Sequence, residues 1–381
     1  MEFGQPPSYN KDGFTAFIPF ANEKDNDFTK AVRCNIQVPK YHGYQRLKPV
    51  YEHNPQMDTG STGLAISARD LGYTIEEQLE QYEKGKEYLS SSRVYYEGYW
   101  VPTTVTFPDG NVIAEVKILA VTFKGRCPDF NETTGNCDRI SEGLHFPPEI
   151  CYLGVGFGRW SKQQPGGTVD KNPLLNIVET NDGMTISRSS IRQGYVITET
   201  GVWVGLAERN TRGFRFTKLS PNPETKHAAR PREWNGTNVF IDYQNANMQG
   251  TALFDTGISQ SYLSAPVFQD CHHLPPEDQY TVKIGNQADN PIETLRMTVD
   301  DFTNPITPPY VRASPREPAF INTGRFFYRS FDLLLDAEDG WLGLRKRELR
   351  KPPGMSRPSV SSQRERSSRP GAETRDSDEE S

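Results

Sequence analysis

The feature that most constrains the fold of this 381-residue chain is a short motif that occurs twice. The first copy is Asp58-Thr59-Gly60-Ser61, which leads into the apolar stretch Leu64-Ala65-Ile66. The second copy, Asp255-Thr256-Gly257, lies 197 positions later and follows the apolar pair Leu253-Phe254. Each copy combines strand-forming residues with a glycine that lets the chain turn sharply. The duplication predicts two related halves, each of which presents one aspartate on a turn.

The rest of the chain is typical of β-structure. Short segments rich in Val, Ile, Thr, Tyr and Phe recur between Gly, Pro, Asn and Asp residues, and they predict strands over 99–107, 112–123, 194–206 and 238–243. Pro108-Asp109-Gly110-Asn111 predicts the turn of a hairpin between the first two strands. The best helix candidate is 74–86, where Thr74 can cap and Glu77 follows three residues later. We therefore expect an all-β fold with few short helices.

Two aspartates on facing turns suit one chemistry in particular. Carboxyl groups brought about 3 Å apart cannot both ionise, so they share a proton and their apparent pKa values split. The ionised group can deprotonate a water molecule while the protonated group polarises a carbonyl, which hydrolyses an amide without a metal ion. Asp58 and Asp255 are the candidate pair. We expect Thr59 and Thr256 to form hydrogen bonds across the junction of the two halves.

Two further segments accompany the turns. Tyr152-Leu153-Gly154-Val155-Gly156 follows the first turn, and Phe320-Ile321-Asn322-Thr323-Gly324 follows the second, ahead of the strand-like segments 331–336 and 339–344. Together with the two Asp-Thr-Gly turns, this order resembles the pepsin-like aspartic peptidase family, in which an apolar-apolar-Gly segment packs beside each aspartate loop. The resemblance extends from about residue 15 to residue 344.

The resemblance implies a bilobal acid protease fold with an active cleft between two related β lobes. It implies endopeptidase activity on peptides or proteins, with Asp58 and Asp255 as the catalytic pair and no cofactor or metal ion. The supporting residues that it implies are Thr59, Gly60, Ser61, Thr256 and Gly257. Both aspartates are present on one chain, so a dimer is unnecessary and we expect a monomer.

The predicted organisation has four parts. An N-terminal extension covers residues 1–14, the first lobe 15–159 and the second lobe 160–344. Residues 345–381 are rich in Arg, Ser, Pro and Glu and almost lack large apolar side chains, so they are predicted to be a disordered tail.

The family resemblance also implies a flap, a hairpin of the first lobe whose tyrosine covers the substrate. Tyr88 is the preferred candidate and Tyr96 the reserve, although serines at 90–92 replace the usual glycines of the tip. The alternative is that both are ordinary cross-strand aromatic residues of a half-buried hairpin.

Two other positions depart from the family pattern. Ser61 can donate a hydrogen bond to Asp58, whereas Ile258, at the corresponding position after Asp255, cannot. Loss of a donor to the charged form favours protonation. We therefore expect Asp255 to hold a proton more tightly than its counterpart in the pepsin-like family, and activity to move toward weakly acidic or neutral pH. Pro55 and Gln56 precede the first motif and fit poorly in a buried central strand.

The composition of the chain limits which partners and which cellular location we expect. The net charge is −6 and no basic face dominates, which argues against a nucleic-acid partner. No apolar run of about eighteen residues predicts a membrane span, and no signal peptide is recognisable, so we expect a cytoplasmic protein, or a secreted one if the N-terminus is truncated. The five cysteines include Cys127 and Cys137, which are equally compatible with a disulfide and with free thiols. Cys271-His272-His273 cannot easily converge on one metal ion.

Other functions fit the sequence less well than a peptidase. The main alternative is a catalytically inactive pepsin-like scaffold that binds peptides or proteins, which the altered flap and the Pro55-Gln56 entry would explain. A glycosidase also uses paired carboxylates, but at about 5 Å or more and without duplicated turns. The histidines lie in no recognisable nucleophile motif.

Overall fold

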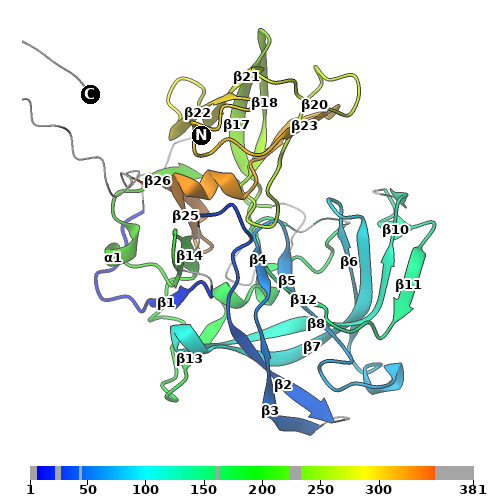
Figure 1. The fold of residues 1–381 in the computed structure, drawn as a ribbon. Helices are drawn as coiled ribbons and strands as arrows, with labels where there is room; N and C mark the ends of the chain where they lie inside the picture. Colours follow the sequence, from blue (N-terminus) through cyan, green and yellow to red (C-terminus); the bar gives the residue numbers. More distant parts are fainter. Residues whose placement is uncertain are drawn as a thin grey trace, which may run out of the picture. The chain divides into compact units, whose positions relative to one another are not determined.

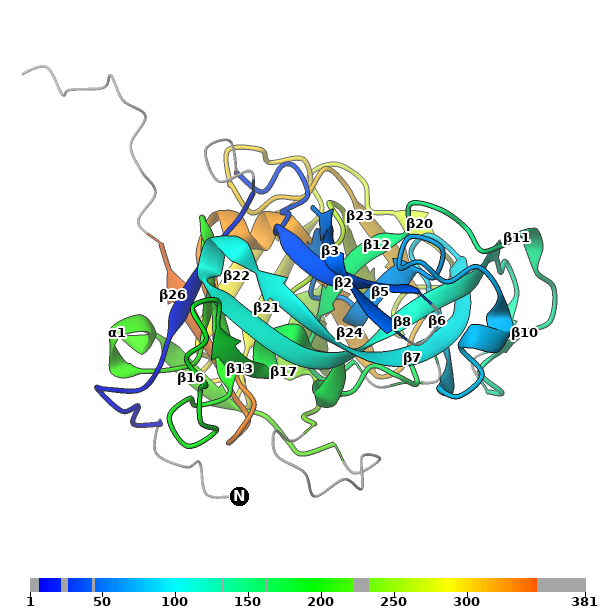
Figure 2. The ribbon, with the colours of Figure 1, turned by 90° about the horizontal axis from the view of Figure 1, so that it is seen from below.

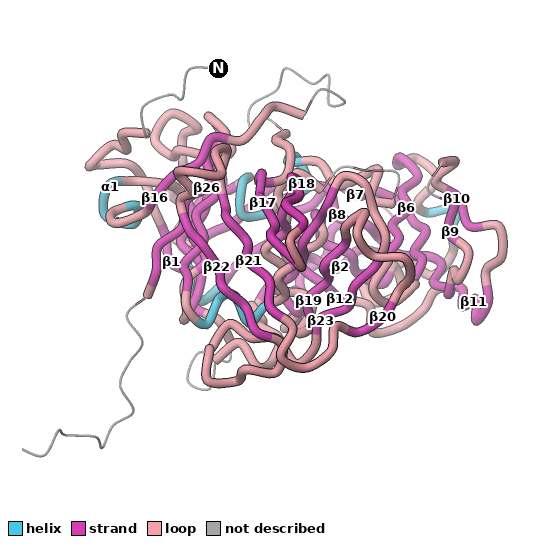
Figure 3. Tube along the Cα trace, turned by 90° about the horizontal axis from the view of Figure 1, so that it is seen from above, coloured by secondary structure: helices cyan, strands magenta, loops and turns pink. Residues whose placement is uncertain are grey.

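Strands and loops make up most of the computed structural model, and the all-β expectation is confirmed (Figures 1 and 3). The structure describes residues 7–21, 27–42, 45–131, 133–159, 161, 163–222 and 233–347. For residues 42 and 45–51 it describes the backbone alone. Within these residues the helical elements are one short α-helix, α1 (Glu208–Thr211), and the 3-10 segments Glu76–Gln78, Pro108–Gly110, Val169–Lys171, Pro173–Leu175 and Arg325–Arg329.

The first large sheet has ten strands and carries the first aspartate. Its main path follows the order β3 (Gln45–His53), β2 (Ile36–His42), β7 (Val94–Phe107), β8 (Val112–Arg126), β5 (Thr62–Ser67), β12 (Cys151–Val155) and β4 (Gln56–Asp58). Three strands pair at its sides: β6 (Glu83–Leu89) with β7, and β11 (Ser141–His145) and β13 (Ile177–Thr180) with β8. Figure 2 shows β7 and β8 as the long curved hairpin of this sheet. Their turn is the predicted one, and Asn111 takes the left-handed conformation that closes it, at φ 53°.

The second large sheet has eight strands and carries the second aspartate. The order is β20 (His272–His273), β23 (Val311–Ser314), β19 (Ser261–Ser264), β24 (Ala319–Asn322), β18 (Ala246–Leu253), β17 (Thr237–Tyr243), β21 (Gln279–Ile284) and β22 (Glu293–Thr298). Buried and half-buried residues alternate along β17, as expected for a strand with one face on a core.

A six-stranded sheet joins segments from distant parts of the chain. Its order is β1 (Ala16–Pro19), β15 (Gly201–Val204), β14 (Gly194–Ile197), β25 (Phe331–Asp336), β26 (Trp341–Lys346) and β16 (Arg215–Lys218). All six residues of β25 are buried, including Asp332 and Asp336, which pair with Arg345 and Arg192. A small pair, β9 (Phe130–Asn131) and β10 (Asn136–Cys137), lies beside a disulfide between Cys127 and Cys137.

The two halves repeat one arrangement around their aspartates. In the first, β12 pairs in parallel with β4, which ends at Asp58, and antiparallel with β5, which follows the turn. In the second, β24 pairs in parallel with β18, ahead of Asp255, and antiparallel with β19. The duplicated motif thus corresponds to a duplicated three-strand unit.

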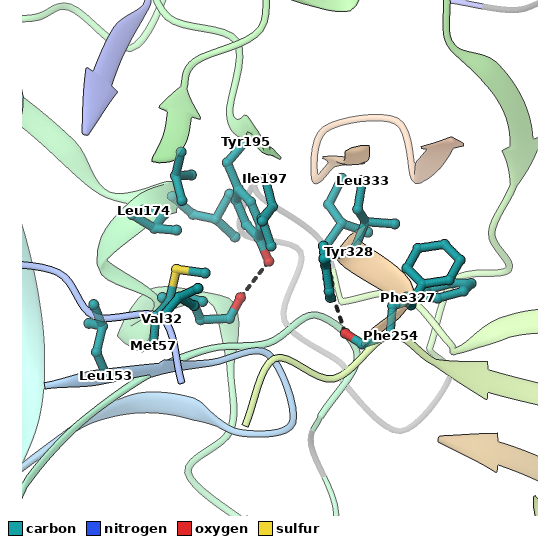
Figure 4. Packing of buried hydrophobic residues seen from close by; sticks show 14 of the residues in the cluster. Val32, Met57, Leu153, Leu174, Tyr195, Ile197, Phe254, Phe327, Tyr328 and Leu333 are labelled. Atoms are coloured by element: carbon teal, nitrogen blue, oxygen red, sulfur yellow. Dashed lines mark hydrogen bonds between the residues drawn. The ribbon is translucent and has the colours of Figure 1, made fainter. Parts of the chain in front are cut away.

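Buried aromatic residues hold the backbone next to these units. The Tyr328 hydroxyl donates to the carbonyl of Phe254, the residue before Asp255, at 2.9 Å (Figure 4). The Tyr195 hydroxyl donates to the carbonyl of Val155 at the end of β12. Both tyrosines are fully buried within one cluster that includes Met57 and Leu153. The aspartate turns therefore stand on close-packed side chains, which limit their movement.

The predicted helix at 74–86 is wrong. Only Glu76–Gln78 is helical, as a 3-10 turn, and β6 begins at Glu83. Pairing of β6 with β7 overrides the local helix signal, and Gly85 lies so close to the Trp100 indole that a side chain there would clash. Thr74 donates its backbone N–H to the Gln78 side chain rather than capping a helix.

The observed strands and contacts cross the predicted domain limits at four positions. Strand β1, placed by prediction in the first lobe, pairs with β15 of the six-stranded sheet, and β13 pairs with β8 beyond the limit at residue 159. Tyr9, in the predicted extension, donates a hydrogen bond to Asp336. Strand β26 continues to Lys346, past the predicted start of the tail. The remainder of that tail, 348–381, lies outside the described residues.

Candidate active site

Asp58 and Asp255 come together, each at the end of its strand unit. A Cβ placed on Gly60 would lie 2.7 Å from Oδ2 of Asp255, and one on Gly257 would clash with Oδ1 of Asp58. Each glycine thus packs against the carboxyl group of the opposite half, where only glycine fits. The two carboxyl groups interact with each other through charge and hydrogen bonding. Asp255 is 5% exposed and Asp58 half-buried.

Two donors hold each carboxyl group. Asp58 accepts from the Gly60 N–H at 2.7 Å and from the Ser61 hydroxyl at 2.6 Å. Asp255 accepts from the Gly257 N–H at 2.7 Å and from the side-chain amide of Asn322 at 2.7 Å. The expectation that Asp255 lacks its second donor is therefore wrong, because Asn322 supplies what Ile258 cannot.

Asn322 reaches Asp255 because of its place in β24. It pairs with Leu253 and Tyr262, so it occupies the position that Tyr152 has in β12. Its side-chain oxygen accepts from the Gly324 N–H at 3.0 Å, which fixes the amide with its nitrogen toward Asp255. Asn322 belongs to the segment that resembles the family, but no sequence signal connects its side chain to a carboxylate 67 residues away.

Thr59 and Thr256 form a reciprocal network at the junction, as the sequence led us to expect. The Thr59 N–H donates to the Thr256 hydroxyl at 3.1 Å, and the Thr256 N–H donates to the Thr59 hydroxyl at 2.9 Å. The Thr59 hydroxyl donates to the Phe254 carbonyl at 2.6 Å, and the Thr256 hydroxyl to the Met57 carbonyl at 2.8 Å. Both threonines are buried, so these bonds are shielded from water.

The environment of the pair favours a shared proton. Burial, and next the negative charge of Asp255, raise the pKa of Asp58 to about 7, while the Ser61 hydrogen bond acts in the opposite direction. One proton is therefore held by the pair up to about neutral pH, which leaves one acid and one base in the same site.

Side chains from outside the turns hold both glycine carbonyls. Gln56 donates to the Gly257 carbonyl at 2.6 Å. Arg159 donates through Nε to the Gly60 carbonyl at 2.8 Å, and Gln164 donates to the same atom at 3.3 Å. The unusual Gln56 therefore has a structural reason: it lies in β4, in parallel register with Tyr152, and its side chain links the first strand unit to the second turn.

Tyr88, the predicted flap tyrosine, is buried beside the disulfide. Its ring stacks on Phe130 with centroids 4.2 Å apart, in a cluster with Cys127, and its hydroxyl donates to the Cys127 carbonyl. The neighbouring residue Glu87 faces the other side of β6, together with its cross-strand partner Tyr96. The Glu87 carboxyl group interacts with the charge of Asp58. Because Tyr96 lies directly opposite Glu87, it shares this face of the β6–β7 hairpin.

Glu87 is a third buried carboxyl group, which sequence reasoning missed. It is 2% exposed, contacts the Tyr152 hydroxyl through Oε2, and leaves Oε1 buried without a hydrogen-bond partner among the described residues. Burial, and then the charge of Asp58, raise its pKa well above the ordinary value. The two-residue alternation of a strand through Tyr88 could have placed Glu87 on the opposite face.

Other predicted sites can be placed as well. Cys127 and Cys137 form a disulfide, while Cys34, Cys151 and Cys271 are free. In the described part of the chain no group of three or more His, Cys, Asp or Glu side chains could hold a metal ion, and no helix is long and apolar enough to cross a membrane.

Comparison with known proteins adds no identification. No protein-family model matches the sequence, and no curated protein matches it significantly.

Proposed function

We propose that this protein is an aspartic endopeptidase that hydrolyses peptide bonds with a water molecule activated by Asp58 and Asp255. The observation that carries the proposal is the meeting of the buried Asp255 and the half-buried Asp58, each held by two donors, with a pKa of about 7 on Asp58. One carboxylate accepts a proton from water while the protonated partner donates to the substrate carbonyl oxygen. This route needs no cofactor.

The supporting residues have distinct roles in the proposed reaction. Gly60 and Gly257 allow the carboxyl groups to approach, and the threonine network fixes the distance between the turns. Ser61 and Asn322 orient the carboxyl oxygens. Preorganisation of this kind lowers the barrier because the polar groups need not reorganise during the reaction.

The decisive experiment is hydrolysis of an internally quenched peptide library at pH values from 3 to 8. Asp58→Asn and Asp255→Asn should each lower kcat/KM by about 10³-fold or more, because either change removes the acid–base pair. Asp289→Asn, at an exposed position of the second half, is the matched control and should retain full activity. A chelator should leave activity unchanged.

An inactive peptide-binding scaffold is the second candidate. It is favoured by the packing of Tyr88 on Phe130 beside the disulfide, where the predicted covering tyrosine is buried. A statine-type peptide, which mimics the tetrahedral intermediate, separates the two functions. Tight binding that depends on pH and is lost in Asp255→Asn supports the peptidase, whereas binding that ignores this change supports the scaffold.

The disulfide bears on the proposed location. A bond between Cys127 and Cys137 is typical of proteins from oxidising compartments and does not favour the cytoplasmic expectation. Thiol titration of the purified protein before and after reduction would measure how much of this pair is oxidised.

A further inference from the structure

Two arginines, Arg159 and Arg325, interact with the charges of the aspartate pair, and a third, Arg316, interacts with Arg159. Arg159 follows the first-half segment after β12, Arg325 begins the 3-10 segment after β24, and Arg316 lies between β23 and β24. Among the described residues none of the three has a carboxylate partner of its own. Other half-buried arginines do: Arg192 pairs with Asp336 at 2.6 Å, and Arg345 with Asp332 at 2.7 Å.

Their positions place positive charge at the site. Arg159 donates to the Gly60 carbonyl at 2.8 Å, and the Arg325 backbone N–H donates to the Ile258 carbonyl at 2.9 Å, so both are tied to the two turns. Both guanidinium groups interact with the charges of Asp58 and Asp255. Arg316 is exposed, packs its guanidinium group over the Phe320 ring at 4.6 Å, and repels the charge of Arg159.

The charges do not balance. A pair that shares one proton carries one negative charge, whereas arginine remains protonated throughout the working pH range. Two cations tied to the turns and a third nearby therefore leave an excess of positive charge. The Nε of Arg325 is buried and has no hydrogen-bond partner among the described residues, so one donor of this guanidinium group is unsatisfied.

On the basis of the proposed peptidase activity, we propose that the site selects substrates with a carboxylate close to the scissile bond, bound by Arg325 and attracted by Arg316. The carboxylate is either an Asp or Glu side chain or the C-terminus of a short peptide. Arg325 is the binding group because the Nε of Arg159 is already engaged by the Gly60 carbonyl. A guanidinium fork matches a carboxylate in two parallel hydrogen bonds, and steering by an exposed arginine depends on salt.

Working pH fits this selection. Substrate Asp and Glu side chains are ionised above about pH 5. The aspartate pair still holds its proton there, since the pKa of Asp58 is about 7. A window near pH 6 therefore combines an active pair with a negatively charged substrate.

The test uses matched quenched peptides at about pH 6, with Glu or Gln at each of three positions on either side of the cleaved bond. A second arm compares free and amidated C-termini, which separates the two sources of the carboxylate. At the best position kcat/KM for the Glu peptide should exceed that for the Gln peptide by about tenfold, as expected for one charge-assisted bond. This ratio should decrease as salt is added.

Variants of single arginines test which residue produces the preference for the Glu peptide. Arg325→Gln should bring the Glu-to-Gln ratio close to one, and Arg325→Lys should restore part of it, because charge returns without the fork. Arg316→Gln should reduce mainly the salt dependence. Arg312→Gln, an exposed arginine of β23, is the matched control and should leave the ratio unchanged.

The outcomes are distinct. Equal hydrolysis of Glu and Gln peptides, or a ratio that survives Arg325→Gln, overturns this inference and leaves the peptidase intact. A changed pH profile in Arg325→Gln with an unchanged ratio also overturns it, since Arg325 would then act only on the aspartate pair. No hydrolysis of any peptide overturns the proposed function itself.

Discussion

The two aspartate turns meet the same chemical requirement in different ways. In the first half the second donor to the carboxyl group is local, since Ser61 stands three residues after Asp58. In the second half the donor is Asn322, 67 residues after Asp255 and brought there by pairing of β24 with β18. The comparison teaches that a duplicated unit can conserve the geometry around a carboxyl group while the residue that provides it moves from the turn to a neighbouring strand.

The exchange extends to the partner strands. Tyr152 and Asn322 occupy equivalent positions, but Tyr152 contacts Glu87 whereas Asn322 holds Asp255. In the same way Gln56, two residues before Asp58, reaches across to the Gly257 carbonyl, while its counterpart Leu253 has an apolar side chain. The first half thus connects outward to β6 and to the second turn, and the second half closes on its own aspartate.

Apart from the aspartates themselves, the largest expected effect concerns the glycines, where the two halves should behave alike. Gly60→Ala and Gly257→Ala each place a methyl group against the carboxyl group of the opposite half. We expect kcat/KM to fall by about 100-fold or more, because displacement of reacting groups by about 1 Å has this cost. Gly236→Ala, where a Cβ would make only ordinary contacts from 3.5 Å, is the control. Full activity in either turn variant would contradict the observed approach of the two turns.

The threonine network should show an asymmetry in stability. Thr256→Val should destabilise the fold by roughly 2–4 kcal/mol, because its loss leaves buried polar groups without a donor or acceptor. Thr59→Val should cost less, since the Phe254 carbonyl keeps the Tyr328 hydroxyl as a donor. Chemical denaturation measures both. A double-mutant cycle with Tyr328→Phe should show coupling to Thr59, and simple additivity would refute shared support of Phe254.

The donor comparison predicts a rescue. Ser61→Ala and Asn322→Ala should each lower kcat/KM by about tenfold, the value of one hydrogen bond to a charged group. Adding Ile258→Ser to Asn322→Ala should recover part of the loss, because a hydroxyl then stands three residues after Asp255, as Ser61 does after Asp58. Ile258→Ser alone, with Asn322 present, should change little. Failure of the rescue would mean that the turns are not interchangeable.

The smallest expected effect is the pH dependence of stability. Asp58 binds its proton more tightly in the folded chain, where its pKa is about 7, than in the unfolded chain, where it is 3.8. Its contribution to stability is therefore complete below about pH 4 and is lost as the pH rises to about 7. Relative to Asp58→Asn, the wild type should lose Tm progressively across this window. Asp289→Asn should run parallel to the wild type, and a parallel curve for Asp58→Asn would show that its pKa is not raised.

Local patterns predicted much of the fold. Alternating and branched apolar residues identified β7, β8 and β17, and Pro108-Asp109-Gly110-Asn111 identified the central hairpin turn. The single strand predicted at 194–206 is wrong, because this segment forms two antiparallel strands, β14 and β15. The helix at 74–86 failed because strand pairing with β7 outweighs a weak capping signal. The pairing of β1 with β15 could not be anticipated, because β-pairing between distant segments leaves no local signal.

The sequence by itself determined the aspartate pair, the glycines that let the turns approach and the threonines that join them, because each of these depends on residue type within one short, duplicated motif. Only the tertiary structure decided that Asn322 replaces the missing hydroxyl and that Gln56 and Arg159 hold the glycine carbonyls. It also decided that the buried Glu87 carboxyl group interacts with the charge of Asp58, while Tyr88 packs on Phe130. A hydrogen bond requires only that two groups lie about 3 Å apart, and which distant residues satisfy this depends on strand register, which sequence spacing does not encode.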